Sequence, residues 1–363
     1  MKTNYTLFTE VTSFYTNLAT ALAGAQDSIS MIYYTFDDGR WSGQISRILR
    51  AKAAAGVKVR LMVDELGLLV DNPRNAFRNQ ALMRELEAAG IQVDIFRPQG
   101  RRLSQFNRLH CKVCAIDQRI AFVGGSNIGD DYPEMRDTNL RLDGDIGHTF
   151  HRLYDYIGQF SRGSEMRQNN TVTRLRLSDL PQLEDTPFRL TLPGQRQDIR
   201  RALLDLILNA EKAIYIRTWY FLPDREILNA LLSQAENGVK VYILLSKHTR
   251  VPLVDAGSYI AGHRLTKAGA RILRYKSQYM HAKVAWNDRG DIILGSANMD
   301  EQSLSGNFEC CLQINDQNLA DALHHTFKAE LRRCQLQTRK TLRRWSWPRQ
   351  AAYYACSYAG AWL

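Results

Sequence analysis

The apolar residues of this chain form short runs that alternate with amphipathic stretches. An amphipathic stretch at residues 12–25 predicts a helix, and the apolar run at 28–36 predicts a buried strand. A helix is expected at 45–55, a strand at 56–65, and a strand that begins with glycine at 90–96. Because strands alternate with helices, we expect an α/β domain with a largely parallel sheet.

The second half of the chain repeats this order of elements. A helix is expected at 200–212 and a strand at 213–221, followed by a helix at 227–237 and strands at 238–246 and 269–275. A repeat of this length indicates a duplicated folding unit. The sequence therefore predicts two tandem α/β domains related by a pseudo-twofold axis.

Changes in composition place the expected domain boundaries. We expect the first domain at residues 1–165, a polar and aperiodic linker at 166–185, the second domain at 186–335 and a tail at 336–363. No stretch reaches the roughly 18–20 apolar residues that a membrane-spanning helix needs, and the N-terminus lacks the apolar core of a signal peptide. We therefore expect no transmembrane helix.

Each predicted domain ends in the same order of polar residues. A histidine is followed by a lysine two positions later, an aspartate seven positions later and an asparagine seventeen positions later. An acidic residue follows at 27 positions in the first copy and at 28 in the second. The matching residues are His110, Lys112, Asp117, Asn127 and Asp137 in the first copy, and His281, Lys283, Asp288, Asn298 and Glu309 in the second. Chance does not readily produce so many coincident polar positions.

The segments around the two histidines have the pattern of strands. In a strand, residues two apart share a face, so His110 and Lys112 should point the same way, as should His281 and Lys283. If the copies face each other across the pseudo-twofold axis, two imidazoles and two ammonium groups surround one cleft. The glycine that follows each segment, Gly295 in the second copy, allows close approach of the backbone to a ligand.

This set of residues suits transfer at a phosphodiester. One histidine can attack phosphorus as a nucleophile, and the other can move a proton to and from the exchanging oxygens. The lysines can stabilise the negative charge on the other phosphate oxygens. An acid beside each ring would fix its tautomer, and we expect Glu309 to serve His281 in this role.

We expect neither a metal nor a cofactor in this site. A lysine on the same face as each histidine places positive charge where a cation would bind. Cys111 and Cys114 flank the first lysine, but alanines occupy the matching positions of the second copy. These cysteines are therefore interpreted as small strand residues.

Composition and charge narrow the class of partner. The chain has 363 residues, of which 45% are hydrophobic and 23% charged, so global disorder is excluded. A net charge of +11 predicts an anionic partner. Residues 331–363 carry seven of these charges and no acid, and the chain ends in an aromatic run. We expect this tail to bind an anionic membrane; the alternative is a C-terminal helix docked on the protein with its arginines in solvent.

The H-x-K-x4-D pattern, present twice and followed by G-G/S-x-N, resembles the phospholipase D superfamily. The segments IAFVGGSNIGDDY and GSANMDEQSLSGNFE resemble those of bacterial cardiolipin synthases of the short, peripheral type, which lack N-terminal membrane helices. The resemblance implies a two-domain α/β sandwich with both motifs at the interface. It also implies phosphatidyl transfer between two phospholipids, with phosphatidylglycerol as donor or acceptor and an alcohol released.

The resemblance also implies roles for individual residues. His110 would be the nucleophile and His281 the general acid and base, although the reverse order stays open. Phosphate would be bound by Lys112, Lys283, Asn127 and Asn298, whereas Asp117 and Asp288 would brace the fold. Ser296 matches a small hydroxyl position of the family, and because Gly125 stands at this position in the first copy, one phosphate contact is expected to be missing there.

Other functions use the same residues. With water as acceptor, the site would belong to a hydrolytic phospholipase D or a nuclease. We do not expect nucleic acid as the partner, because the basic excess lies in the aromatic tail and not along the repeats. A non-enzymatic membrane scaffold would not require two intact motifs. The second substrate is left open between phosphatidylglycerol and phosphatidylethanolamine, and we expect a peripheral protein on the cytoplasmic side of the cell membrane.

Overall fold

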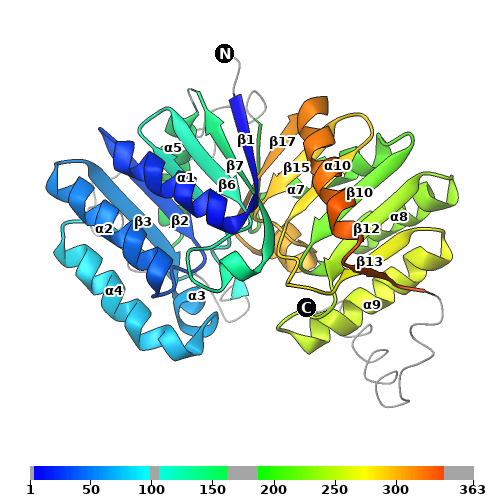
Figure 1. Ribbon diagram of the computed structural model, residues 1–363, viewed down its shortest axis with the longest axis horizontal. Coiled ribbons are helices and arrows are strands. Elements are labelled where there is room, and N and C mark those ends of the chain that lie inside the picture. Colours follow the sequence, from blue (N-terminus) through cyan, green and yellow to red (C-terminus); the bar gives the residue numbers. More distant parts are fainter. Residues whose placement is uncertain (1–3, 99–105, 145, 162–186, 339–363) are drawn as a thin grey trace.

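Two mixed β-sheets lie side by side in the computed structural model, with helices on their outer faces (Figure 1). The structure describes residues 4–98, 106–144, 146–161 and 187–338. The expected linker at 166–185 and residues 339–363 of the expected tail lie outside these ranges.

The first sheet has seven strands in the order β1-β7-β6-β5-β2-β3-β4. Its strands are β1 (Asn4–Glu10), β2 (Ser28–Tyr33), β3 (Lys58–Asp64), β4 (Gln92–Phe96), β5 (Val113–Ile116), β6 (Ile120–Gly124) and β7 (Arg136–Asp143). The helices of this domain are α1 (Val11–Gly24), α2 (Arg40–Ala54), α3 (Glu65–Val70), α4 (Ala76–Ala88) and α5 (Gly147–Gly158), with short 3₁₀ turns η1 (Pro73–Asn75) and η3 (Tyr132–Glu134).

The second sheet has nine strands in the order β18-β13-β12-β10-β14-β15-β17-β8-β9. Its strands are β8 (Phe188–Leu192), β9 (Arg196–Gln197), β10 (Ala213–Thr218), β12 (Lys240–Ser246), β13 (Arg271–Tyr275), β14 (Val284–Asn287), β15 (Asp291–Gly295), β17 (Glu309–Asn315) and β18 (Cys334–Leu336). A small separate pair is formed by β11 (Phe221–Leu222) and β16 (Met299–Asp300). The helices are α7 (Asp198–Leu208), α8 (Arg225–Glu236), α9 (Pro252–Lys267) and α10 (Gln317–Leu331), with the π-helical turn η6 (Gln302–Gly306).

The two sheets share one topology. Read from β1 to β4 and from β8 to β13, the strands follow the same order, and β9 and β18 only extend the edges of the second sheet. The tandem α/β domains predicted from the repeat are thus confirmed, as is their pseudo-twofold relation. The elements expected at residues 28–36, 56–65, 213–221 and 238–246 correspond to β2, β3, β10 and β12.

The expectation of largely parallel sheets is wrong. In each of the two large sheets only three strands pair in parallel, β2-β3-β4 in the first and β10-β12-β13 in the second. The remaining strands of these sheets pair antiparallel, and the separate pair of β11 and β16 is parallel. The reason lies in the short turns after the histidine segments, because a tight turn can join only antiparallel neighbours.

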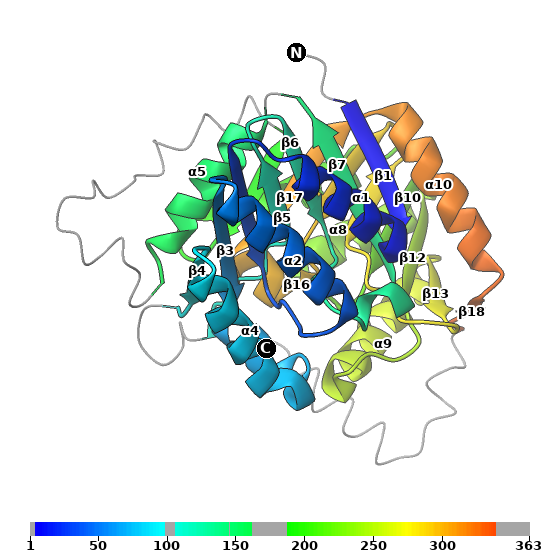
Figure 2. The ribbon, with the colours of Figure 1, turned by 60° about the vertical axis from the view of Figure 1, so that its left-hand side comes forward.

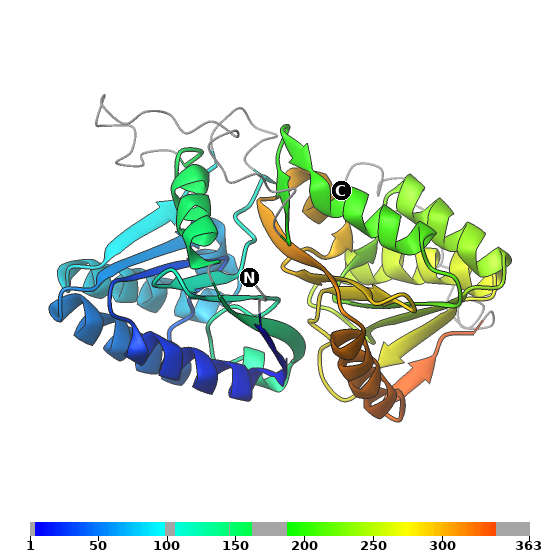
Figure 3. The ribbon, with the colours of Figure 1, turned by 90° about the horizontal axis from the view of Figure 1, so that it is seen from above.

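The buried apolar side chains form three clusters, one beneath the outer helices of each domain and one between the two sheets. Figure 3 shows the sheets and helices from above. Helices α1, α2 and α4 cover the outer face of the first sheet, and α7, α8 and α9 cover that of the second. Between the sheets, apolar side chains of both domains form a continuous core that includes Leu140, Leu294 and Leu312. The ring of Phe150 on α5 packs edge-on against Phe188 of β8, with 4.2 Å between centroids. The domains therefore bury a large common interface.

The chain stays packed on the second sheet beyond the expected end of that domain. Strand β18 pairs with β13, and the Gln337 side chain binds Arg274 and the carbonyl oxygen of Tyr259. A tail, if separate, therefore begins after these residues. Among the described residues, none of the helices combines the length and the apolar character that crossing a membrane requires.

Candidate active site

Each histidine lies in an extended segment that ends at a strand of its own domain and borders the other domain. The backbone N–H of His110 donates to the carbonyl of Phe308 at 2.9 Å, and that of His281 donates to the carbonyl of Arg136 at 2.7 Å. Isolated bridges join Leu109 to Phe308 and Arg136 to Met280. Both motif histidines are thus fixed at the interface between the two sheets.

The side chains of the histidines pair crosswise with the acids of the opposite domain. His110 Nδ1 lies 2.7 Å from Glu309 Oε1, and His281 Nδ1 lies 2.6 Å from Asp137 Oδ2. The prediction that Glu309 serves His281 is therefore wrong. The acid next to each ring comes from the start of β7 or β17 of the other domain, because that strand end borders the histidine segment across the interface.

The two acids are held by serines at non-equivalent positions. Ser296 Oγ donates to Glu309 Oε2 at 2.5 Å, and Ser126 Oγ donates to Asp137 Oδ2 at 3.0 Å. Gly125 occupies the position that matches Ser296, where an added Cβ would lie only 2.2 Å from Asp137 Oδ1. In the first copy, Ser126 thus supplies the hydroxyl that Gly125 lacks. A side chain at position 125 would collide with the Asp137 carboxylate, so this position requires glycine. Sequence reasoning missed Ser126.

Both motif lysines are buried beside their histidines. Lys112 Nζ donates to the carbonyl of His110 at 2.6 Å, and Lys283 Nζ donates to the carbonyl of His281. Burial lowers the pKa of Lys112 to about 8 and that of Lys283 to about 7, although nearby carboxylates oppose this. A bound anion would restore their charge, so the pair suits a phosphate group.

One aromatic residue in each domain covers the histidine and lysine of that domain. Tyr34 follows β2 and packs edge-on against His110, with 5.4 Å between centroids. Trp219 follows β10 and packs edge-on against His281 at 4.2 Å. Lys112 and Lys283 lie 5.6 and 5.7 Å from the centroids of these rings. Sequence reasoning missed both, although they stand at matching positions of the repeat.

The second copy contains polar groups without a partner among the described residues. The indole N–H of Trp219 and the amide oxygen of Asn298 are buried and make no hydrogen bond there. In the first copy, by contrast, the Asn127 amide donates to the Tyr132 hydroxyl at 2.8 Å, and Tyr132 donates to Asp71. The Tyr132 ring packs against His281 at 5.6 Å. The site is therefore asymmetric in its asparagines, because Asn127 is already bonded to Tyr132 whereas the Asn298 oxygen has no partner among the described residues.

The aspartates of the two motifs lie at the far ends of their strands, away from the histidines. Asp117 accepts hydrogen bonds from the backbone N–H groups of Asp27 and Ser28, at 2.8 and 3.0 Å from its Oδ1. Asp288 accepts from those of Lys212 and Ala213 at 2.9 and 3.0 Å. Both carboxylates thus anchor the start of a central strand, β2 or β10.

Burial and charge set the protonation states of the site. Burial lowers the pKa of both imidazoles, and for His281 the charge of Lys283 lowers it further. Burial alone would raise the pKa of Asp137 and Glu309, but the paired histidines and nearby lysines outweigh it and leave both lowered. With a carboxylate on Nδ1, a neutral ring presents its Nε2 lone pair to a substrate, whereas a ring protonated on both nitrogens presents Nε2–H as a proton donor.

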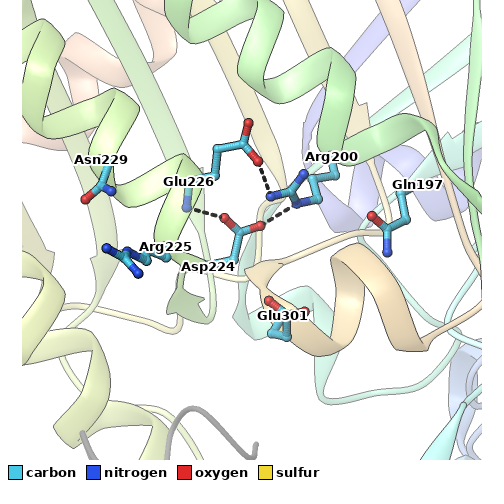
Figure 4. A pocket seen from close by; sticks show the side chains of 7 residues that line it. All are labelled: Gln197, Arg200, Asp224, Arg225, Glu226, Asn229 and Glu301. Atoms are coloured by element: carbon cyan, nitrogen blue, oxygen red, sulfur yellow. Dashed lines mark hydrogen bonds and ion pairs between the residues drawn. The ribbon is translucent and has the colours of Figure 1, made fainter.

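A separate cavity of about 710 Å³ lies away from the histidines. It is lined by residues of β9 and α7, by the start of α8 with the residue before it, and by the residue after β16 (Figure 4). There Arg200 bridges Asp224 and Glu226 at 2.6 Å each, and Glu301 adds another acid. These charges nearly balance, so the cavity is not an anion site. Among the described residues, no cluster of His, Cys, Asp or Glu is arranged to hold a metal ion.

The chain is similar to known proteins along most of its length. The family described as cardiolipin synthase, PLD-like domain, matches residues 18–143 and 203–331, which covers both halves of the site. The chain belongs to this family. Within the PLD-like cardiolipin synthase family, it is 30% identical over 356 residues to the major cardiolipin synthase ClsA of Bacillus subtilis, covering 90% of this chain and 70% of that protein. It is 27% identical over 348 residues to cardiolipin synthase 1 of Staphylococcus epidermidis, covering 92% and 69%.

Solved structures support the fold of this PLD-like family member. Phosphatidylserine synthase of Haemophilus influenzae superposes with a TM-score of 0.73 at 16% identity, over 98% of this chain and 93% of that one. Polyphosphate kinase of Porphyromonas gingivalis superposes with a TM-score of 0.64 at 14% identity, over 100% and 54%. At these identities, the likeness concerns the fold alone.

Proposed function

We propose that this protein is a cardiolipin synthase, which moves a phosphatidyl group from one phosphatidylglycerol to a second and releases glycerol. The observation that carries this proposal is the crosswise pairing, His110 with Glu309 and His281 with Asp137. It gives one interface two oriented imidazoles beside two buried lysines. Membership of the cardiolipin synthase family supports the same reaction.

In the first step, His110 attacks the phosphorus of the donor phospholipid. A bond forms between Nε2 and phosphorus, and the bond from phosphorus to the glycerol oxygen breaks. His281, which begins the step protonated on both nitrogens and paired with Asp137, gives its Nε2 proton to that oxygen, so glycerol leaves and a phosphatidyl-histidine remains. The side chain of His110 is 16% exposed and that of His281 is 7% exposed. His110 is therefore assigned the attacking role, because its ring is the more accessible of the two.

In the second step, the roles of the groups reverse. A hydroxyl of the acceptor phosphatidylglycerol gives its proton to His281 as its oxygen attacks phosphorus. The nitrogen–phosphorus bond breaks and cardiolipin is released, which returns both histidines to their starting state. Trp219 and Tyr132 pack on His281 and limit its contact with water, which favours a lipid hydroxyl over water as acceptor.

The lysines and asparagines bind the phosphate in this proposal. Lys112 and Lys283 stabilise the charge that grows on the non-bridging oxygens. The Asn298 side chain would donate from its amide nitrogen to the same oxygens, and its amide oxygen has no partner among the described residues, whereas the Asn127 amide nitrogen must first leave Tyr132. Phosphatidylethanolamine remains the second candidate substrate, because its headgroup would be released in the same way.

The site of action in this proposal is the cytoplasmic face of the cell membrane, where the protein binds peripherally. Membership of the family and the lipid nature of the proposed substrates support a reaction at a membrane surface. The basic and aromatic residues at 336–363 would contribute to this binding through the anionic headgroups.

A product assay tests the proposed function. Purified protein is incubated with vesicles of defined phosphatidylglycerol, and lipids and alcohols are identified by mass spectrometry. We expect cardiolipin and glycerol in equal amounts. Phosphatidic acid as the main product would identify a hydrolase instead. Unchanged lipid would contradict both the synthase and the hydrolase.

A further inference from the structure

The site lies at one edge of the two sheets. The parallel strands β2, β3 and β4, and their counterparts β10, β12 and β13, all end at this edge. Strands β5 and β14, which run antiparallel to them, begin here, directly after the histidine segments. The segments that follow β3, β12 and β13 therefore lie at the same edge as the site.

Exposed apolar side chains collect on these segments. Among the described residues, ten large apolar side chains are exposed, and six of them belong here. We call this set the site-edge rim: Leu66 and Val70 on α3, Phe77 at the start of α4, Val251 and Leu253 at the start of α9, and Tyr279 before His281. Phe77 is 87% exposed. Figures 1 and 2 both show α4 and α9 on the lower side of the molecule, and Figure 1 shows α3 between them.

The two halves of the rim contact each other and the site. Arg250 of the second domain binds Asp131 at 2.7 Å and the carbonyl of Asp71 at 3.1 Å, which joins the start of α9 to the end of α3. Gly67 of α3 packs so closely on the Tyr34 carbonyl that an added Cβ would lie 1.9 Å from it. The rim is thus continuous with the aromatic wall of the site.

The part of the rim that belongs to the second domain is connected to the site by stacked aromatic rings. Tyr279 is 38% exposed and stacks on Trp219, with 5.7 Å between centroids and an angle of 9°. Trp219 in turn packs on His281. Only the rings of Tyr279 and Trp219 therefore lie between this part of the rim and the imidazole of His281.

Basic side chains flank the apolar rim. Arg74 and Arg78 are exposed beside Phe77, and Lys247 and Lys276 are exposed where β12 and β13 end. The two edges differ in their apolar residues, because Leu208, at the end of α7, is the only one of the ten large apolar side chains that lies at the opposite edge. Both edges carry bases and acids: Lys58 and Lys240 lie near Asp27 and Glu211 at the opposite edge, and Arg250 lies near Asp131 at the rim. Apolar residues with flanking positive charge match an anionic bilayer, where apolar groups enter the acyl boundary and basic groups meet the phosphates.

We propose that the site-edge rim is the surface on which this protein sits on an anionic phospholipid bilayer. Six apolar side chains enter the headgroup boundary, and the flanking arginines and lysines contact lipid phosphates. This orientation faces the histidines toward the membrane, so a phospholipid reaches them without leaving the bilayer entirely. The inference deepens the proposed function and rests on it for the substrate, but binding itself can be measured without turnover.

Matched pairs of variants in the full chain test this surface. Phe77→Asp combined with Leu253→Asp alters the rim, and Leu208→Asp is the control on the opposite edge. Arg74→Gln combined with Lys276→Gln removes rim charge, and Lys58→Gln combined with Lys240→Gln is its control. Each protein is sedimented with vesicles of phosphatidylcholine and phosphatidylglycerol, and turnover is measured separately on short-chain, monomeric phosphatidylglycerol.

We expect the apolar rim variant to lower the vesicle-bound fraction about tenfold, because burial of two large apolar side chains is replaced by two charges facing anionic lipid. Its turnover of monomeric lipid should stay close to that of the unaltered protein, which also shows that it folds. The charge variant should lose binding chiefly at low salt. Both controls should bind normally.

Normal vesicle binding by the apolar rim variant would overturn the proposal. So would a change from dimer to monomer in that variant with vesicle binding intact, because the rim would then be a contact between copies of the chain. Absence of turnover on every form of phosphatidylglycerol by the unaltered protein would reject the proposed function, while the binding comparison would still decide the role of the rim.

Discussion

His281 and Asp137 form a hydrogen bond across the domain interface, with 2.6 Å between Nδ1 and Oδ2, although 144 positions separate them in the chain. The pair His110 and Glu309 repeats this arrangement in the opposite direction. Each domain thus supplies the imidazole of one pair and the carboxylate of the other. Neither domain contains a complete pair, so the site requires both.

Loss of either carboxylate should slow turnover while leaving the fold intact. We predict that Asp137→Asn and Glu309→Gln each lower kcat by about 10²- to 10⁴-fold, because the amide cannot hold the imidazole in its reactive tautomer or stabilise its positive form. Steady-state kinetics and thermal melts measure the two effects. Asp143→Asn, at the exposed end of β7, is the control and should be unchanged. Activity near the original level in both carboxylate variants would contradict the tautomer role.

Gly125 should tolerate no side chain. We predict that Gly125→Ala lowers activity at least tenfold, because its Cβ would lie 2.2 Å from Asp137 Oδ1 and displace the carboxylate from His281. Gly43 on α2 has no atom within 4 Å of an added Cβ, so Gly43→Ala should keep full activity and a stability equal to or above that of the original. Equal activity of the two variants would show that Asp137 has room to move.

Activity should fall on the alkaline side as the lysines lose their protons. The free site has Lys283 with a pKa of about 7 and Lys112 with a pKa of about 8. Only the protonated form binds a phosphate anion well, so kcat/KM should be highest below these values and decline as the pH rises through them. A pH profile on monomeric lipid measures this, and Lys283→Arg should move the decline to higher pH. A kcat/KM that rises steadily from pH 7 to pH 9 would contradict the lowered values.

The indole N–H of Trp219 should contribute to turnover apart from its ring. It is buried beside His281 and has no partner among the described residues. We predict that Trp219→Phe, which keeps a ring but removes the donor, lowers kcat about tenfold with a smaller effect on KM, as for a donor used mainly in the transition state. Unchanged kcat would assign Trp219 to packing alone.

The repeat made much of this site predictable, and its limits are physical. Equal spacing in the two copies identified His110, His281 and both lysines as candidates, since the motif is local. The partner of each ring could not be found in this way, because Glu309 is near His281 in the sequence but near His110 in space. That pairing depends on how the two sheets pack. Ser126 was missed for a related reason, because it performs the role of Ser296 from the following position.

The aromatic residues of the site and the antiparallel direction of the strands were also not predicted from the sequence. Tyr34 and Trp219 stand at equal positions after β2 and β10, so an alignment of the two halves could have found them. Their chemistry is not evident from a run of apolar residues. The strands after the histidines resemble others in composition, and only their short turns indicate the antiparallel pairing.

A mixing experiment with His110→Ala and His281→Ala tests the shared site most directly. Each variant alone should lack turnover of phosphatidylglycerol while melting close to the unaltered protein. Because both histidines of a site belong to one chain, an equimolar mixture of the two variants should stay inactive. Substantial cardiolipin formation by either variant alone, or recovered activity in the mixture, would contradict a single phosphate-binding site built from the two halves of one chain.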